Sequence, residues 1–489
     1  MPLALPYKLL ILLITLSIPV TEPVTVLAEG MAIYNPGEEL PGGDTSHHKP
    51  RNRDVFTHAS ANMRLANRLR FELGDSVFAD IWLPSPSTST ASDGLGPLYN
   101  AHACEECHPR DGRGHPPTAN WPNDRAVSMF LRLSIPPQTL EHHQLLKSGK
   151  VGVIPEPVYG GQLQNFSING LSEEGHMHIS YTEKTVNMAD GTEIRLRKPE
   201  YTVSELNFGP LHPDVMLSPR VAPHMLGLLL LEAIPESDIL SLSDPDDTDG
   251  DGISGRPNRV WDMFSEQQAL GRFGWKAGNP TVIQQTVSAL SNDIGIATPY
   301  MPSSSGDCTS AQITCLSQPN GNTPLQENTE ASSIVVEQLV IYTGNLGPPA
   351  RPDALKPEVL RGKRVFQRIG CHKCHQPSFQ TAYRPDLAEQ SAQLIWPYSD
   401  LLLHDMGEGL ADHRPEYLAS GREWRTPPLW GIGLTETVSG HSNFLHDGRA
   451  RNLLEAILWH GGEAEASRQQ VINLTSSERH ALITFLNSL

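Results

Sequence analysis

The chain has 489 residues, which is more than one ordinary hydrophobic core and predicts two or three domains. Its formal net charge of −18 argues against nucleic acid and against anionic membrane surfaces as partners. With 38% hydrophobic residues, 40 Gly and 41 Pro, the composition is that of a globular protein with many loops.

The first 28 residues have the pattern of an export signal. One early charge, Lys8, precedes an apolar run at residues 9–18, and small residues lead to a cleavage site after Ala28. The run is too short to predict a membrane span, and no later stretch is long and uncharged enough. We therefore expect residues 1–28 to be a signal peptide and the mature protein to lie in the periplasm of a Gram-negative bacterium, without an integral membrane span. An uncleaved anchor is the alternative.

Residues 29–125 are predicted to form the first part of an N-terminal domain. Its helix is expected over residues 56–73, with three leucines on one face: Leu65, Leu69 and Leu73. A Cys-x-x-Cys-His motif follows at residues 104–108 and occurs again at residues 371–375.

This motif is the attachment signature of a c-type haem. Its two thiols add across the vinyl groups of one porphyrin, and the adjacent histidine becomes the proximal iron ligand. A redox dithiol and half of a zinc site are the alternatives, but a zinc ribbon needs two such pairs about 15–20 residues apart. Haem attachment takes place outside the cytoplasm, in agreement with the export signal. The sequence thus predicts two covalently bound haem c groups, held by Cys104, Cys107 and His108 and by Cys371, Cys374 and His375.

Residues 126–300 are predicted to be a mixed α/β insertion that packs on the first haem. Apolar and polar residues alternate at 128–134 and 177–182, as in strands, whereas 226–234 and 281–294 are apolar helical segments.

Residues 301–331 are a loop of low complexity that contains Cys308 and Cys315. In an oxidising compartment these two cysteines are expected to form a disulfide. A structural clip is favoured over a redox-active pair, because nothing nearby in the sequence lowers a thiol pKa.

Residues 332–489 are predicted to form a C-terminal cytochrome c-like haem domain. Helices are expected at 332–342, 357–367, 453–460 and 476–489, with Ser476 and Ser477 as caps. The complete pattern predicts a mainly α fold, in which two cytochrome c-like haem domains flank a β-containing insertion.

The sequence around the second motif resembles the C-terminal half of bacterial dihaem cytochrome c peroxidases. It is most similar to the dihaem oxidoreductase family, whose members are also called peroxidases or thiol oxidoreductases. The resemblance covers nearly the whole mature chain and rests on residues 398–407, 424–430, 444–449 and 454–463, on 108–114 after the first motif, and on 249–258.

The resemblance implies a division of labour between the two haems. The C-terminal haem would accept electrons from a small cytochrome or cupredoxin, and the N-terminal haem would react with peroxide. Where the peroxidases place a distal methionine, this chain has His460, which shares a helix face with Leu453 and Ile457. We therefore expect His460 as the sixth ligand of the second haem, with His404 and Met406 as alternatives. Histidine in place of methionine should lower the potential of that haem.

For the first haem, the resemblance implies a distal histidine and a polar pair that moves protons. His115 is the candidate ligand in a resting state, and Gln162 and Glu174 are the candidates for peroxide cleavage. Polar residues on a strand surface are the ordinary alternative for both. Tyr159 is a candidate for the position of the interhaem tryptophan of the peroxidases.

The run Asp247, Asp249 and Asp251 has the alternating carboxylates of a calcium-binding loop. Asn258 stands at the twelfth position in place of glutamate, so this is not an EF-hand. The resembling peroxidases hold a calcium ion between their domains, which implies one Ca²⁺ here. An acidic turn bonded to its own backbone is the alternative.

These features favour a periplasmic dihaem peroxidase-type oxidoreductase that takes electrons from a small carrier protein and acts on a small-molecule oxidant or substrate. The alternative is a dihaem electron carrier with two six-coordinate haems, although the large insertion exceeds what a carrier requires. Thiol oxidation rests on the family label alone, and no free cysteine outside the two motifs and the expected disulfide supports it.

Overall fold

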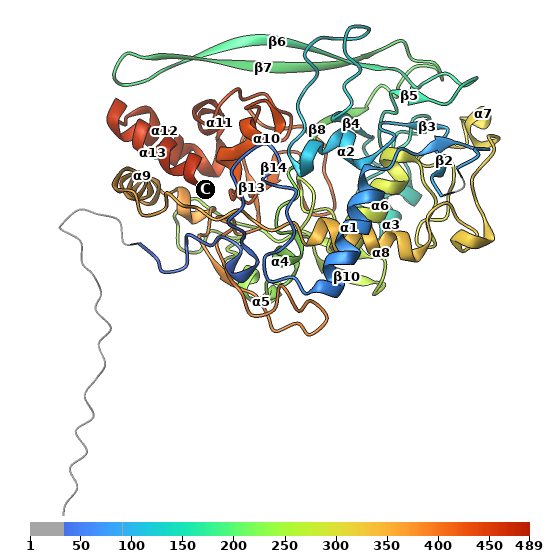
Figure 1. Cartoon of the computed structure of the whole chain (residues 1–489). Helices are drawn as coiled ribbons and strands as arrows, with labels where there is room; N and C mark the ends of the chain where they lie inside the picture. Colours follow the sequence, from blue (N-terminus) through green and yellow to red (C-terminus); the bar gives the residue numbers. More distant parts are fainter. Residues whose placement is uncertain (1–33, 90) are drawn as a thin grey trace, which may run out of the picture.

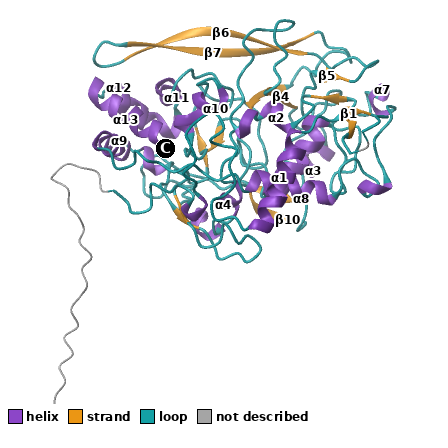
Figure 2. Ribbon diagram, in the orientation of Figure 1, coloured by secondary structure: helices purple, strands orange, loops and turns teal. Residues whose placement is uncertain are grey.

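The computed structural model describes residues 34–89 and 91–489, so the predicted signal peptide lies outside the described residues. Helices make up 28% of the structure and strands 18%, and every sheet in the described part has two strands (Figure 2). The prediction of a mainly α, cytochrome c-like fold is therefore wrong. Long connections rich in Gly and Pro keep most helices short, so that loops and strand pairs build much of the interior.

The helices lie mostly at the two ends of the molecule (Figure 1). Their bounds are α1 Leu65–Ala79, α2 Cys104–Cys107, α3 Leu140–Lys147, α4 Leu228–Glu232, α5 Glu236–Leu240, α6 Val282–Ala289, α7 Ile313–Leu316, α8 Ser333–Gly344, α9 Pro357–Arg368, α10 Thr435–Ser439, α11 Leu453–Trp459, α12 Glu465–Ile472 and α13 Ser476–Ser488.

The strands form separate pairs rather than one sheet. The bounds are β1 Leu83–Pro84, β2 Asp93–Leu95, β3 Leu98–Tyr99, β4 Met129–Ser134, β5 Phe166–Ser167, β6 His176–Asn187, β7 Glu193–Ser204, β8 Met216–Val221, β9 Arg259–Asp262, β10 Gln267–Leu270, β11 Phe379–Gln380, β12 Leu394–Ile395, β13 Leu403–Asp405 and β14 Glu423–Arg425. The expected strands at 128–134 and 177–182 are confirmed by β4 and β6.

Helix α1 packs against α8 beside the first motif (Figure 1). The helix begins later than expected, and its predicted leucine face points outward: Leu65 is 77% exposed. The buried face is formed by Phe71, Gly74 and Phe78 instead. Gly74 is required there because a Cβ would lie 2.3 Å from a backbone oxygen of α8. Close helix contact, rather than leucine spacing, thus decided which face is inside.

The C-terminal part of the chain is built from the expected helices. Helix α9 packs closely on α13, since a Cβ at Gly362 would lie 1.9 Å from the Ala481 carbonyl oxygen. The cap of α13 is Thr475, which forms a capping box with Glu478, and not Ser476 or Ser477.

A long hairpin of β6 and β7 extends over the C-terminal helices (Figure 1). Arg197 of β7 donates to the carbonyl oxygens of Gly448 and Arg449 at 2.9 and 2.8 Å, and Tyr201 donates to Asp447 at 2.9 Å. The predicted insertion therefore contacts residues 447–449 of the C-terminal part of the chain through β7. None of the helices described in the structure is long and apolar enough to cross a membrane.

Candidate functional site

One cavity of about 610 Å³ reaches both Cys-x-x-Cys-His motifs. Cofactor and ligand pockets commonly have volumes of ~300–1,000 Å³. Helix α6 and the π-helical turn Leu290–Ile294 line the part near the first motif, and α11 lines the part near the second. Motifs that are far apart in the sequence thus open onto the same interior space.

The first motif is held by α2 and the loop before α4. His108 contacts the Pro223 carbonyl oxygen through Nδ1 at 2.8 Å, which fixes Nδ1 as the donor and leaves Nε2 free toward the cavity. Burial lowers the pKa of His108 to about 4, so the ring is neutral, as iron ligation requires.

The second motif repeats this arrangement at the end of α9. His375 contacts the Tyr398 carbonyl oxygen through Nδ1 at 2.9 Å. Burial lowers its pKa to about 4, with His460 among the neighbouring groups that lower the pKa further. Both motif histidines therefore have Nδ1 held by a backbone carbonyl oxygen, and this arrangement suits a metal ligand that binds through Nε2.

His460 is held in the same way, although it lies outside the two Cys-x-x-Cys-His motifs. Its Nδ1 contacts the Ala456 carbonyl oxygen at 2.8 Å, and burial lowers its pKa. Leu453, Ile457 and His460 all line the cavity, which confirms the predicted inward face of this helix.

The two alternatives to His460 differ in their surroundings. His404 contacts Glu463 through Nδ1 at 2.7 Å and Asp400 through Nε2 at 2.8 Å, so both ring nitrogens are used. Although burial opposes it, these carboxylates hold the pKa of His404 well above its ordinary value. A protonated imidazole whose two nitrogens both donate hydrogen bonds has no lone pair for iron. Met406 lines the cavity and remains a candidate on placement alone.

Three buried arginines in the cavity wall bear on whether the cavity suits a haem, because a haem carries two negatively charged propionates. Arg113, Arg272 and Arg425 are each 8% exposed, and among the described residues their hydrogen bonds are to backbone oxygens and not to carboxylates. For example, Arg272 donates to the Leu231 carbonyl oxygen at 2.8 Å. Buried unpaired cations are costly, and the two propionates of a haem would supply the missing anions. The residues present therefore fit two haem groups.

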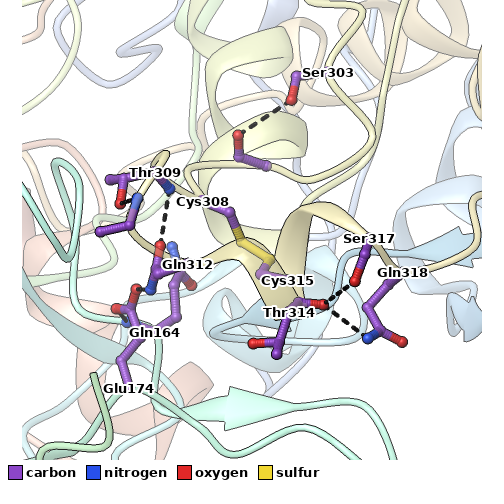
Figure 3. Close-up of a disulfide and its surroundings, with 12 residues drawn as sticks. Gln164, Glu174, Ser303, Cys308, Thr309, Gln312, Thr314, Cys315, Ser317 and Gln318 are labelled. Atoms are coloured by element: carbon purple, nitrogen blue, oxygen red, sulfur yellow. Dashed lines mark hydrogen bonds between the residues drawn. A yellow bond between two sulfur atoms is a disulfide. The ribbon is translucent and has the colours of Figure 1, made fainter.

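The candidates for peroxide chemistry do not line the cavity. Glu174 is buried and accepts hydrogen bonds from the Gln164 backbone N–H and from Gln312 of the disulfide loop (Figure 3). Burial raises its pKa well above the usual value. His115 is half-buried, contacts the Pro116 carbonyl oxygen and lies against His441. Their roles stay predictions.

Gln162 does not line the cavity but contacts a residue that does. Its Nε2 donates at 2.9 Å to Asp293, which does line the cavity. Asp293 was not predicted, because nothing in the apolar helix pattern at 281–294 distinguishes its position.

Tyr159 is also outside the cavity wall, with its hydroxyl group bonded to the Gly209 carbonyl oxygen. The aromatic side chains that line the cavity include Trp275 and Trp424, and His446 stacks on Trp424 at 3.7 Å. His446 lies within a segment that carried the family resemblance, but no role was predicted for it. His224, which was also missed, lines the cavity, and its buried Nδ1 has no partner among the described residues.

The acidic run is divided between two sites. Oxygen atoms of Asp244, Asp247 and Asp249 lie within 4.8 Å of one another. Asp251 instead pairs with Lys373 of the second motif at 2.8 Å. Asp244 was not predicted, since it precedes the alternating run.

The structure forms the expected disulfide between Cys308 and Cys315 (Figure 3). Its loop contacts the insertion near Gln162, where Asp307 accepts hydrogen bonds from the N–H groups of Gly161 and Gln162 at 2.6 and 3.0 Å.

Comparison with known proteins places this site in a class. The sequence model of the family described as "Di-haem oxidoreductase, putative peroxidase" matches residues 37–489. Among solved structures, hydrazine synthase of Kuenenia stuttgartiensis matches 33% of this chain and 57% of its own chain, with 20% identity and a TM-score of 0.23. No curated protein matches this chain.

The chain belongs to the di-haem oxidoreductase family, which the family model establishes over nearly the whole described chain.

Proposed function

We propose that this protein is a periplasmic enzyme that takes electrons at the haem on Cys371 and Cys374 and reduces peroxide at the haem on Cys104 and Cys107. The observation that carries the proposal is an asymmetry within one cavity. The second motif has a further histidine nearby, His460, whose Nδ1 contacts the backbone and whose Nε2 has no hydrogen-bond partner among the described residues. A haem with two histidine ligands suits electron transfer, whereas an open iron position permits chemistry.

In this proposal both haems are covalently bound, and each residue of the motifs has a defined task. The four thiols would form thioether bonds, His108 and His375 would be proximal ligands, and His460 would be the sixth ligand of the second haem. Arg113, Arg272 and Arg425 would hold propionates. The haems supply the redox chemistry, and the protein excludes water and moves protons.

Two further parts of the proposal concern location and partner. The disulfide between Cys308 and Cys315 supports an oxidising compartment such as the periplasm. A small cytochrome or cupredoxin would deliver electrons to the second haem; a basic one would be attracted by the net charge of −18.

We also propose one Ca²⁺ at Asp244, Asp247 and Asp249. Support comes from the closeness of their oxygen atoms and from the position of the loop. The same loop reaches the second motif through the Asp251–Lys373 pair, and Ser254 donates to Glu463, which holds His404.

The test is the reaction of the half-reduced protein with hydrogen peroxide. Stopped-flow spectra should show rapid oxidation of the second haem only when peroxide is added. The alternative is a dihaem electron carrier, favoured by His224, whose neutral ring lies in the cavity wall. A carrier would show low-spin iron at both haems and no rapid reaction with peroxide.

A further inference from the structure

Asp293 is singled out by its place in the cavity wall. The carboxylates that line the cavity in the described chain are those of Asp293 and Glu416. Glu416 pairs with Arg414 at 2.9 Å and with Arg220 at 3.4 Å. Asp293 has no ion-pair partner among the described residues, and its Oδ1 accepts a hydrogen bond from Gln162. The Glu416 carboxylate is thus neutralised by ion pairs, whereas the Asp293 carboxylate is available for another role.

The backbone places Asp293 beside the first motif. It lies in the π-helical turn Leu290–Ile294, which ends at Gly295 with φ 80°. Its carbonyl oxygen accepts hydrogen bonds from the N–H groups of Asn100 and Ala101, at 2.8 and 3.2 Å, directly before the first motif. Short π-helical segments occur frequently at functional sites. After burial, the Asp293 carboxylate is the largest influence that raises the pKa of both Cys104 and Cys107, so it lies close to both thiols.

The Asp293 side chain is held in one orientation. Gln162 donates to it at 2.9 Å, and the Gln162 backbone is fixed in turn by Asp307 of the disulfide loop at 3.0 Å. Burial raises the pKa of Asp293, which brings the carboxyl group nearer to the range in which it can both accept and donate a proton.

We propose that Asp293 is the proton-transfer residue of the first haem, and that Gln162 is its positioning residue. This inference rests on the proposed peroxide chemistry. Reduction of one hydrogen peroxide takes two electrons and two protons and gives two water molecules. The electrons come from the carrier protein through the haems, and the two protons come from the solvent. Asp293 accepts a proton from the entering peroxide and returns it to the departing oxygen as the O–O bond breaks.

The experiment measures cyanide association with the ferric holoprotein. Hydrogen cyanide must lose its proton to bind iron, so its association reports the proton acceptor without any turnover. Asp293→Asn should slow both cyanide association and peroxide reaction by about 100-fold or more, in line with general acid–base contributions of ~10²–10⁴. Gln162→Leu should cause a smaller loss in both, with haem content unchanged.

The matched control is Glu232→Gln. Glu232 accepts a hydrogen bond from the Val282 N–H at the other end of α6, its pKa is also raised by burial, and it does not line the cavity. This variant should retain wild-type rates. If Asp293→Asn fails to take up haem, Gln162→Leu and Asp293→Glu replace it as the test. Asp293→Glu should retain part of the wild-type rate of cyanide association.

Each outcome separates the inference from the function on which it rests. Wild-type rates in Asp293→Asn and Gln162→Leu would overturn the inference and leave the peroxidase proposal intact. Slowed cyanide association in Asp293→Asn, with a wild-type protein that does not react with peroxide, would support the proton acceptor and contradict the peroxidase. A wild-type protein that binds no cyanide would contradict both.

Discussion

The two ends of the cavity have the same attachment motif but different side chains around it. At the second motif, Nε2 of His460 is available in addition to Nε2 of His375, and His404 is held by two carboxylates. At the first, the distinctive group is Asp293, a carboxylate without an ion-pair partner in the described chain. The difference indicates how one duplicated motif can serve two tasks. Histidine ligation with fixed charges favours electron transfer, and an uncommitted acid favours proton transfer.

The largest expected effect comes from breaking the buried charge cluster behind the second end of the cavity. Asp412 pairs with the fully buried Lys276 at 2.9 Å and with Arg220 at 3.4 Å. Asp412→Ala should lower the free energy of unfolding by about 3–5 kcal/mol, because it leaves buried cations without a partner. The control is Asp405→Ala, which removes a partly exposed pair with Arg422 and should cost about 1 kcal/mol or less. Denaturant unfolding measures the free energy of unfolding of both variants. Equal losses would contradict the conclusion that Asp412 neutralises buried cations.

Substitution of His460 should remove the sixth ligand of the second haem, so that its iron becomes open like that of the first haem. His460→Ala is expected to turn the second haem from low-spin to high-spin iron while covalent attachment is retained. His460→Met should raise its potential instead. Absorption and EPR spectra measure the spin state, with the exposed His413→Ala as a control. An unaltered low-spin spectrum in His460→Ala would make Met406 the next ligand to test.

The two regions should also respond to pH in opposite directions. Burial raises the pKa of Glu330, in the first region, to about 7. Its stabilising contribution is complete below its unfolded pKa of ~4.3 and is lost as the pH rises through 7. Burial would raise the pKa of Asp447, in the second region, but the Arg449 guanidinium lowers it to about 2. That contribution is present above the unfolded pKa of ~3.9 and is lost as the pH falls toward 2.

Thermal unfolding between pH 4.5 and 7 tests this contrast. Glu330→Gln should flatten the loss of stability that accompanies rising pH in this window, and Asp447→Asn should leave its slope unchanged. The contrast fails if both variants have the wild-type slope.

Calcium removal should produce the smallest change, and mainly at the second haem, because Asp251 of the acidic loop pairs with Lys373. Chelation, or Asp249→Asn, is expected to lower Tm by roughly 1 °C for each kcal/mol of lost binding free energy, because the shift per kcal/mol becomes smaller as a chain becomes longer. Elemental analysis that finds no calcium, together with an unchanged Tm on chelation, would leave the run as an ordinary acidic turn.

The sequence predicted the parts of the site that depend on local spacing. The motif residues converge as expected, and Leu453, Ile457 and His460 line the cavity because a helix repeats its face every few residues. The fold class was predicted wrongly, since short paired strands and loops carry weak periodic signals. The leucines of α1 gave a misleading face because Gly74 allows close contact with α8.

Asp293 and Asp244 were both missed. Asp293 acquires its significance from a π-helical turn and from Gln162, which is more than a hundred residues away in the chain. Asp244 joins the acidic cluster through a turn that brings it to Asp247. The Asp293 contact depends on tertiary structure and leaves no pattern in a single sequence, whereas the Asp244 contact is a local turn that lies just before the alternating run.

We infer that one haem has two histidine ligands and that the other has an open iron position. Low-temperature EPR of the fully oxidised protein, with haem content determined on the same sample, distinguishes these two states. We expect two haems per chain, with one low-spin signal that is lost in His460→Ala and one high-spin signal that changes on addition of cyanide. Two low-spin signals, neither altered by cyanide, would contradict this inference.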